Sequence, residues 1–265
     1  MAYNQLHIAS LNSGSNGNCY YIGNDQDAVL VDVGLSCRET EKRMSRIGLS
    51  MDKVRAIFIS HEHTDHIKGL PVLSKKFNLP VYLTTGTLKG CKFDLKQELV
   101  RPLPAHEAVI VGNLSVTGFP KIHDASDPYS FMIAYGETKI GVFTDLGAVC
   151  EQLTYYFKQC HAAFLETNYD DDLLSKSAYP YFLKQRISGG RGHLSNKQAL
   201  ELFTAHKPSF MSHLLLSHLS KDNNCPELAV NLFKEHARGT EIVVASRHAE
   251  TAVYTISEPA TVHSF

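Results

Sequence analysis

The densest group of chemically active side chains in this sequence is the segment HEHTDH at positions 61–66, with three imidazoles and two carboxylates. It follows the apolar run 54–59, which predicts a buried strand. Burying such groups costs several kcal/mol unless each is paired or bound to a metal. The first two histidines project the same way from an extended chain, while the aspartate and last histidine begin the next helix. The segment therefore predicts two adjacent metal sites, and its nitrogen and carboxylate ligands suit zinc, iron or manganese.

An HxHxDH segment after an apolar strand resembles the signature of the metallo-β-lactamase superfamily. Three later segments supply the other ligands that two-metal members need, and they are FPKIHD (119–124), FTDLG (143–147) and LLSHLS (215–220). Each contains a residue type that alone is more often structural, but their joint occurrence in the required order favours a metal centre. The resemblance implies that His61, His63 and His123 bind one ion, that Asp65, His66 and His218 bind the other, and that Asp145 bridges both. It also implies that Asp32 orients ligand imidazoles through hydrogen bonds.

The implied centre predicts a hydrolase with two divalent metal ions, Zn, Mn or Fe. Two ions about 3.5 to 4 Å apart that share a hydroxide and Asp145 activate water near neutral pH for in-line attack. Asp65 is the expected acceptor or orienter of the proton of this water. A redox diiron protein is the alternative, but diiron members of the superfamily typically carry HxExDH, and this sequence has His63 at the second position.

The segment GHLSN at 192–196 resembles a motif of the phosphodiesterase branch of the superfamily, especially of tRNA 3'-end processing nucleases. The resemblance implies that His193 protonates the leaving oxygen and that Glu166 orients it. An unperturbed histidine pKa of about 6.5 suits this role. The alternative is that His193 only caps the following helix, although Ser195 or Asn196 could do so instead.

Polar side chains near His193 are candidates for phosphate binding, together with the backbone amides at 194–196 at the start of a helix. For the basic residues Lys184, Arg186 and Arg191, a solvated surface is an equally good interpretation. The residues expected to contact substrate are Asn168, Arg191, Ser195, Asn196, Asn223 and Asn224.

Several short motifs together resemble the bacterial YycJ/WalJ-type proteins over nearly the whole chain. They include SGSNGN at 13–18, HDASDP at 123–128 and HLSKDNN at 218–224. This resemblance implies a metal-dependent nuclease with 5'-to-3' exonuclease activity on double-stranded DNA. Tyr169 departs from the pattern, which has a histidine there, and this puts any accessory role of the position in doubt. A cyclic phosphodiesterase would use the same ligands, and an inactive scaffold would be expected to have lost some of them.

Length and composition place the chain among ordinary globular proteins, with 265 residues, 43% of them hydrophobic, and a formal net charge of -1. No internal repeat or linker marks a boundary, so we predict a single domain over 1–265. The N-terminal residues lack the pattern of a signal peptide, and no run of 18 apolar residues occurs. We therefore expect a cytoplasmic protein without membrane contact.

Strand and helix patterns alternate along the chain, which predicts an α/β fold. Ser36 and Glu39 predict a capping box before a helix that Gly48 can end. The resemblance to the superfamily implies a four-layered αβ/βα sandwich. The expected strands cover 6–11, 19–23, 28–32, 54–59, 80–84, parts of 108–144, 162–166, 211–217 and 241–246. The further expected helices cover 67–77, 148–158, 179–187, 195–206 and 226–237.

Overall fold

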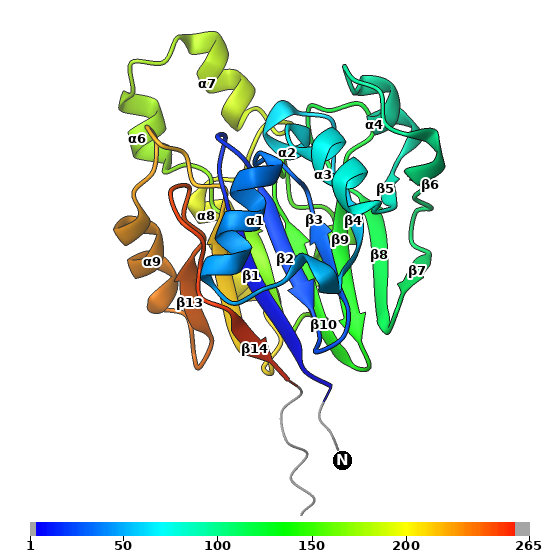
Figure 1. The fold of residues 1–265 in the computed structure, drawn as a ribbon. Coiled ribbons are helices and arrows are strands. Elements are labelled where there is room, and N and C mark those ends of the chain that lie inside the picture. The colour runs from blue at the N-terminus through cyan, green and yellow to red at the C-terminus, as the bar shows by residue number, and fades with distance from the viewer. Residues whose placement is uncertain (1–3, 258–265) are drawn as a thin grey trace, which may run out of the picture.

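The computed structural model describes residues 4–257, which contain two seven-stranded sheets that pack face to face (Figure 1). In spatial order, the first sheet consists of β14 (Tyr254–Ile256), β1 (Leu6–Asn12), β2 (Cys19–Gly23), β3 (Ala28–Val31), β4 (Val54–Phe58), β5 (Val81–Leu83) and β6 (Val100–Pro102). The second consists of β13 (Glu241–Val244), β12 (His213–Ser217), β11 (Ala162–Glu166), β10 (Thr138–Phe143), β9 (Tyr129–Tyr135), β8 (Leu114–Pro120) and β7 (Ala108–Val111).

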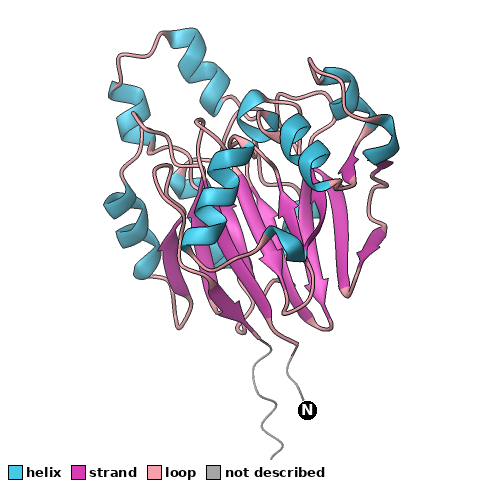
Figure 2. Cartoon of the chain, in the orientation of Figure 1, coloured by secondary structure: helices cyan, strands magenta, loops and turns pink. Residues whose placement is uncertain are grey.

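Helices cover both outer faces of the sheet pair (Figure 2). The α-helices of residues 4–257 are α1 (Cys37–Arg46), α2 (Thr64–Ile67), α3 (Leu70–Phe77), α4 (Thr85–Gly90), α5 (Glu151–Phe157), α6 (Asp171–Lys176), α7 (Tyr181–Ser188), α8 (Asn196–His206) and α9 (Pro226–Lys234), and α7 lies beyond the ends of the strands rather than on either face (Figure 1). Three apolar clusters hold the layers together. One lies between the sheets, one includes Met44 of α1 and Leu73 of α3 against the first sheet, and one includes Phe157, Phe203 and Phe233 of α5, α8 and α9 against the second. This arrangement confirms the predicted four-layered sandwich.

The strand directions bring the site-bearing loops to one rim. β3 and β4 are parallel in the first sheet, and β10, β11 and β12 are parallel in the second. β8 also runs parallel to β10, because both are antiparallel to β9, which lies between them. The segments that follow these six strands therefore leave the sheets at their carboxyl ends, where α/β sheets commonly place their sites.

The structure differs from the predicted elements at several places, which include α4 and α6, where no helix was predicted. The helix predicted over 67–77 is interrupted at Gly69, where the loop after β3 crosses and a Cβ atom would lie 1.9 Å from the Leu35 carbonyl oxygen. Ser36 does accept a hydrogen bond from the Glu39 amide (3.3 Å), but the Glu39 carboxylate binds Arg43, so the box is not reciprocal. The last two strands of the described chain lie in different sheets, since β13 pairs with β12 and β14 with β1.

No helix within residues 4–257 is long and apolar enough to cross a membrane. The six cysteines are all free thiols. Cys19, Cys37 and Cys160 are buried, and the others are partly exposed.

Candidate metal centre

Three histidine nitrogens face one another at the rim of the two sheets. His61 follows β4, is fully buried, and has its Nδ1 2.8 Å from Ser60 Oγ, so its Nε2 points toward His63 Nδ1 at 3.0 Å. His123 follows β8, and its Nδ1 donates to the Gly192 carbonyl oxygen (2.9 Å) while its Nε2 lies 3.4 Å from His63 Nδ1. Fixing one ring nitrogen in this way leaves the other free to bind a metal. These three side chains form one candidate ligand group.

A second candidate group consists of Asp65, His66 and His218. His66 Nδ1 lies 2.7 Å from Asp32 Oδ2, in a contact in which both side chains are fully buried. The other oxygen of Asp32 accepts a hydrogen bond from the Ser60 amide (2.8 Å), which ties the carboxylate to the start of the HxHxDH segment. His218 presents its Nε2 to Asp65 Oδ2 at 3.5 Å. Asp32 therefore contacts one of the ligand imidazoles that it was expected to orient.

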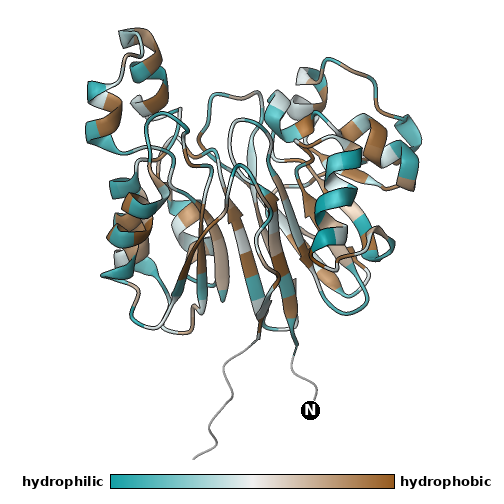
Figure 3. Cartoon of the chain, turned by 60° about the vertical axis from the view of Figure 1, so that its left-hand side comes forward, coloured by the Kyte–Doolittle hydropathy of each residue, from teal (hydrophilic) through white to brown (hydrophobic). Residues whose placement is uncertain are grey.

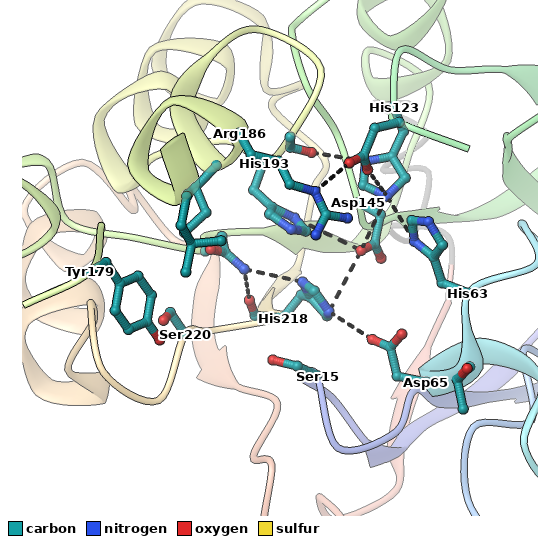
Figure 4. Close-up of a pocket in the computed structure, with 16 residues that line it drawn as sticks. Ser15, His63, Asp65, His123, Asp145, Tyr179, Arg186, His193, His218 and Ser220 are labelled. Atoms are coloured by element: carbon teal, nitrogen blue, oxygen red, sulfur yellow. Dashed lines mark hydrogen bonds and ion pairs between the residues drawn. The ribbon is translucent and has the colours of Figure 1, made fainter. Parts of the chain in front are cut away.

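Asp145 lies between the two groups (Figure 4). Its Oδ2 is 3.1 Å from His66 Nε2, and its Oδ1 is 3.6 Å from His218 Nε2 and 3.9 Å from His123 Nε2. Asp145 and His218 both have positive φ angles, 55° and 57°, and so does Asp32, at 61°. Non-glycine residues rarely adopt this conformation, which is concentrated at functional sites. The structure thus brings the seven predicted ligands together. They also form other overlapping groups, such as His61, His66 and Asp145, so their division between two ions stays a prediction.

Two buried polar atoms of this cluster have no hydrogen-bond partner in the described chain, namely Asp145 Oδ2 and His218 Nε2. His66 Nε2 approaches the aspartate oxygen but forms no hydrogen bond with it. Leaving such atoms unpaired, close to the buried carboxylates of Asp32 and Glu166, is costly unless a cation is present. The donor set therefore fits divalent metal ions.

The histidines of the two groups differ in electrostatics. Burial lowers the pKa of His61 well below its usual value, and burial lowers the pKa of His123 to about 4, so both rings are neutral and ready to act as ligands. Burial also acts to lower the pKa of His66 and of His218, but the negative charges of Asp145 and neighbouring carboxylates outweigh this effect. They raise the pKa of His66 well above its usual value and that of His218 to about 10. Metal binding would therefore release protons from these two rings.

Glu166, at the end of β11, is fully buried and contacts the predicted acid. Its Oε1 lies 2.8 Å from His193 Nδ1 and 3.2 Å from His218 Nδ1, and its Oε2 accepts hydrogen bonds from the amides of Leu146 and Leu194. Burial alone would raise the pKa of Glu166, but the charge and hydrogen bond of His193 outweigh it and lower the value to about 2. The ionised carboxylate thus fixes His193 by its Nδ1 and leaves Nε2 available.

A cavity of about 460 Å³ opens beside these groups, and its lining includes His193, Asp145, Asn168, Ser15, Tyr179 and Arg186 (Figure 4). Of the six residues expected to contact substrate, Asn168 is the one that lines it. The side-chain amide of Asn168 donates through Nδ2 to the His218 carbonyl oxygen (2.8 Å), so this side chain also supports a predicted ligand.

The amides at the start of α8 have intramolecular acceptors, which corrects the expectation that they receive a phosphate. The amide of Leu194 donates to Glu166, that of Ser195 to Gln198 Oε1 (2.9 Å), and that of Asn196 to the Tyr169 carbonyl oxygen (2.7 Å). Ser195 forms the full capping box, so His193 does not serve as the cap.

The other residues that were expected to contact substrate lie outside the cavity lining. The side chains of Asn196 and Asn224 are paired, since the Nδ2 of each donates to the Oδ1 of the other (3.0 and 2.9 Å). Asn224 Nδ2 also donates to the carbonyl oxygens of Thr167 and Asn168. Asn223 is buried outside the cavity lining, and Arg191 is exposed outside it. Tyr169 is likewise buried away from the cavity, and burial raises its pKa to about 12.

Two residues next to the predicted ligands had no role in the sequence interpretation. Asn18 Nδ2 lies 3.2 Å from Asp65 Oδ2 and 3.1 Å from His66 Nε2. Lys121 is buried, and its Nζ donates to the Thr144 carbonyl oxygen (2.6 Å), directly before Asp145. Lys121 lies two residues before the predicted ligand His123, and this proximity along the chain was the available signal for it.

Comparison with known proteins agrees with this geometry. A family model described as a beta-lactamase superfamily domain matches residues 27–218. The chain is 34% identical over 232 residues to exodeoxyribonuclease YycJ of Bacillus anthracis, covering 84% of this chain and 86% of that protein. It is 30% identical over 226 residues to exodeoxyribonuclease WalJ of Streptococcus pneumoniae, covering 83% of each. The chain belongs to the metallo-β-lactamase superfamily and, within it, to the YycJ/WalJ family.

Solved structures show the same fold across the superfamily. The metallo-β-lactamase fold protein YhfI of Bacillus subtilis superposes with a TM-score of 0.71 at 17% identity, covering 95% of this chain and 99% of that one. The short form of human tRNase Z superposes with a TM-score of 0.64 at 16% identity, covering 96% and 99%. Both resemblances extend over nearly the full length of this metallo-β-lactamase fold.

Proposed function

We propose that this protein is a dinuclear metal-dependent exonuclease that degrades double-stranded DNA in the 5'-to-3' direction. As a member of the YycJ/WalJ family, it is a metal-dependent hydrolase that acts on phosphodiester bonds. The observation that carries the proposal is the position of Asp145 between two histidine groups, beside the pair of His193 and Glu166. The names of the two relatives support DNA as the substrate.

The proposed ligands of one metal ion, Zn, Mn or Fe, are His61, His63 and His123, and those of a second are Asp65, His66 and His218, with Asp145 shared. When bound, two such ions supply Lewis acidity that activates a water molecule near neutral pH and offsets the charge developing on the phosphate. Asp65 accepts or orients the proton of the attacking water. Asp32 and Glu166 hold His66 and His218 in position by their Nδ1 atoms.

His193 is the proposed general acid. Hydrolysis forms a P–O bond to the water oxygen and breaks the P–O bond to the leaving nucleotide, whose alkoxide oxygen needs a proton. His193 Nε2 supplies this proton while Glu166 holds Nδ1 at 2.8 Å and stabilises the charged ring. Asn168 keeps the His218 backbone in place from the cavity wall.

Metal analysis combined with a substrate screen tests the proposal. We expect the purified protein to bind two ions per chain and, with Mn or Zn, to degrade 5'-phosphorylated duplex DNA. Asp145→Ala should abolish hydrolysis and reduce the bound metal, because it removes the side chain shared by both groups. Asp94→Ala, at an exposed aspartate, is the matched control and should leave both unchanged.

Two results would contradict the proposal. Hydrolysis of cyclic nucleotides without hydrolysis of DNA or RNA would indicate a small-molecule phosphodiesterase. Full metal occupancy without hydrolysis of any phosphodiester would indicate a redox protein or a scaffold.

A further inference from the structure

Helix α7 stands apart from the layers of the sandwich, beyond the carboxyl ends of the strands (Figures 1 and 3). None of its residues is buried. At its start, Tyr181 and Phe182 are 76% and 72% exposed, which makes them the most exposed large hydrophobic side chains in residues 4–257. A helix with no buried face gains little stability from packing, and adjacent exposed aromatic rings on such a helix point to a binding surface.

The same helix forms part of the wall of the cavity described above. Leu183, Arg186 and Ile187 line it, at the spacing of one face of a helix. Phe182 lies one turn from Arg186 and borders this face, whereas Tyr181 lies on the other side of the helix at its first residue. Arg186 is held by a 2.7 Å contact between its Nε and Asp124 Oδ2, yet its side chain stays 62% exposed. The cavity wall therefore leads from the candidate metal centre to the ring of Phe182, and Tyr181 follows at the start of the helix.

The size of the cavity limits what can reach the metal centre. A volume of about 460 Å³ falls in the range of about 300–1,000 Å³ that holds one small ligand. It has room for roughly one nucleotide and not for a base pair with both of its backbones. A strand that places a whole nucleotide in this cavity must be unpaired there, and its neighbouring bases need another surface on which to stack.

We propose that α7 is a stacking platform for the unpaired end of a nucleic acid strand. Tyr181 and Phe182 stack on its bases, and Arg186 binds a backbone phosphate near the scissile one. The charge of the helix fits this partner, because α7 carries Lys184 and Arg186 and no acidic residue. Aromatic rings next to basic side chains are the usual combination in proteins that bind single strands. This inference rests on the proposed nuclease function and adds that a duplex end must separate before it is cut.

Binding and hydrolysis by the metal-loaded protein test the platform. The binding probe is a labelled duplex with an unpaired 5'-phosphorylated end and phosphorothioate linkages that resist cleavage. The double variant Tyr181→Ala, Phe182→Ala should bind it at least about 10-fold more weakly, as expected for the loss of stacked bases. The same variant should raise KM for duplex DNA and leave the hydrolysis of bis(p-nitrophenyl) phosphate unchanged, because it removes no group near the metal centre.

Three comparisons complete this experiment. Phe182→Trp should retain binding, and Tyr155→Ala on α5, which removes a tyrosine that is 64% exposed, should have no effect. Wild-type protein should cut a duplex with a mismatched end faster than one with a fully paired end. Unchanged binding by the double variant would overturn the inference. If binding is unchanged and the double variant is a monomer where the wild-type protein is a dimer, the rings form a contact between two copies of the chain instead. If wild-type protein cuts no DNA but binds the probe through these rings, the proposed function fails and the platform stands.

Discussion

Glu166 contacts two histidines to which we assign different roles. One of its oxygens lies within 3.2 Å of the Nδ1 atoms of both His193 and His218, and the other is held by two backbone amides. A buried carboxylate fixed in this way orients a ligand and an acid together, so the two imidazoles keep a constant position relative to each other. At the scale of single residues, this shared contact links metal binding to proton transfer.

Replacing the proposed acid should affect substrates according to their leaving groups. We expect His193→Ala to lower kcat on DNA by about 10²- to 10⁴-fold, the usual contribution of general acid catalysis. Hydrolysis of bis(p-nitrophenyl) phosphate should fall far less, because p-nitrophenolate leaves without being protonated. Steady-state kinetics on both substrates check this, and an equal loss on both would assign His193 to metal binding instead.

Among the elements, the short helix α2 depends on a close approach of two backbones. A Cβ atom at Gly34 would lie 1.7 Å from the Asp65 carbonyl oxygen, which also accepts a hydrogen bond from the Asn18 amide (2.7 Å). The amide of Val33 donates to the His66 carbonyl oxygen (2.7 Å). The loop after β3 therefore sets the position of the two ligands that α2 carries.

Gly34→Ala should displace α2 and weaken metal binding. We expect a loss of about 1–3 kcal/mol in the free energy of unfolding, as for other overpacked sites, together with a lower affinity for zinc. Gly48→Ala is the control, because Gly48 has a φ of +74° and open space around it, so it adds backbone strain without touching the site. Urea unfolding and zinc titration of both variants measure this, and unchanged zinc affinity in Gly34→Ala would contradict it.

In the whole molecule, the candidate metal centre joins the two sheets. His61 follows a strand of the first sheet, whereas His123, Asp145 and His218 follow strands of the second. An apolar cluster between the sheets connects the same halves. We therefore propose that the chain forms the single domain predicted over 1–265, with its halves held together by the core and by bound metal. Residues 1–3 and 258–265 lie outside the described part of the chain.

Removing the metal should lower the stability of the whole molecule. A ligand at 100 times its dissociation constant stabilises the folded state by about 2.7 kcal/mol, and the separated carboxylates and histidines of an unfolded chain bind metal more weakly. Chelation should thus lower the urea midpoint of the wild-type protein, while that of Asp145→Ala should respond much less. Equal responses of the two proteins would place the stabilising metal elsewhere.

The sequence predicted most elements, because their apolar periodicity records which faces are buried. It did not predict α4, α6 or the break at Gly69. Those features depend on neighbours distant along the chain, such as the Leu35 carbonyl oxygen beside Gly69. The pairing of β14 with β1 likewise joins the two ends of the described chain, a contact that no local pattern records.

The sequence by itself determined the chemistry of the site, since ligand types and their order along the chain are properties of the residues. Only the tertiary structure decided which groups meet. In the folded chain, the backbone amides at the start of α8 donate to acceptors within the protein, and Lys121 and Asn18 lie beside the predicted ligands. The aromatic rings at the start of α7 are exposed. The physical reason is that hydrogen-bond satisfaction depends on partners from separate strands and loops, which become neighbours only when the two sheets pack.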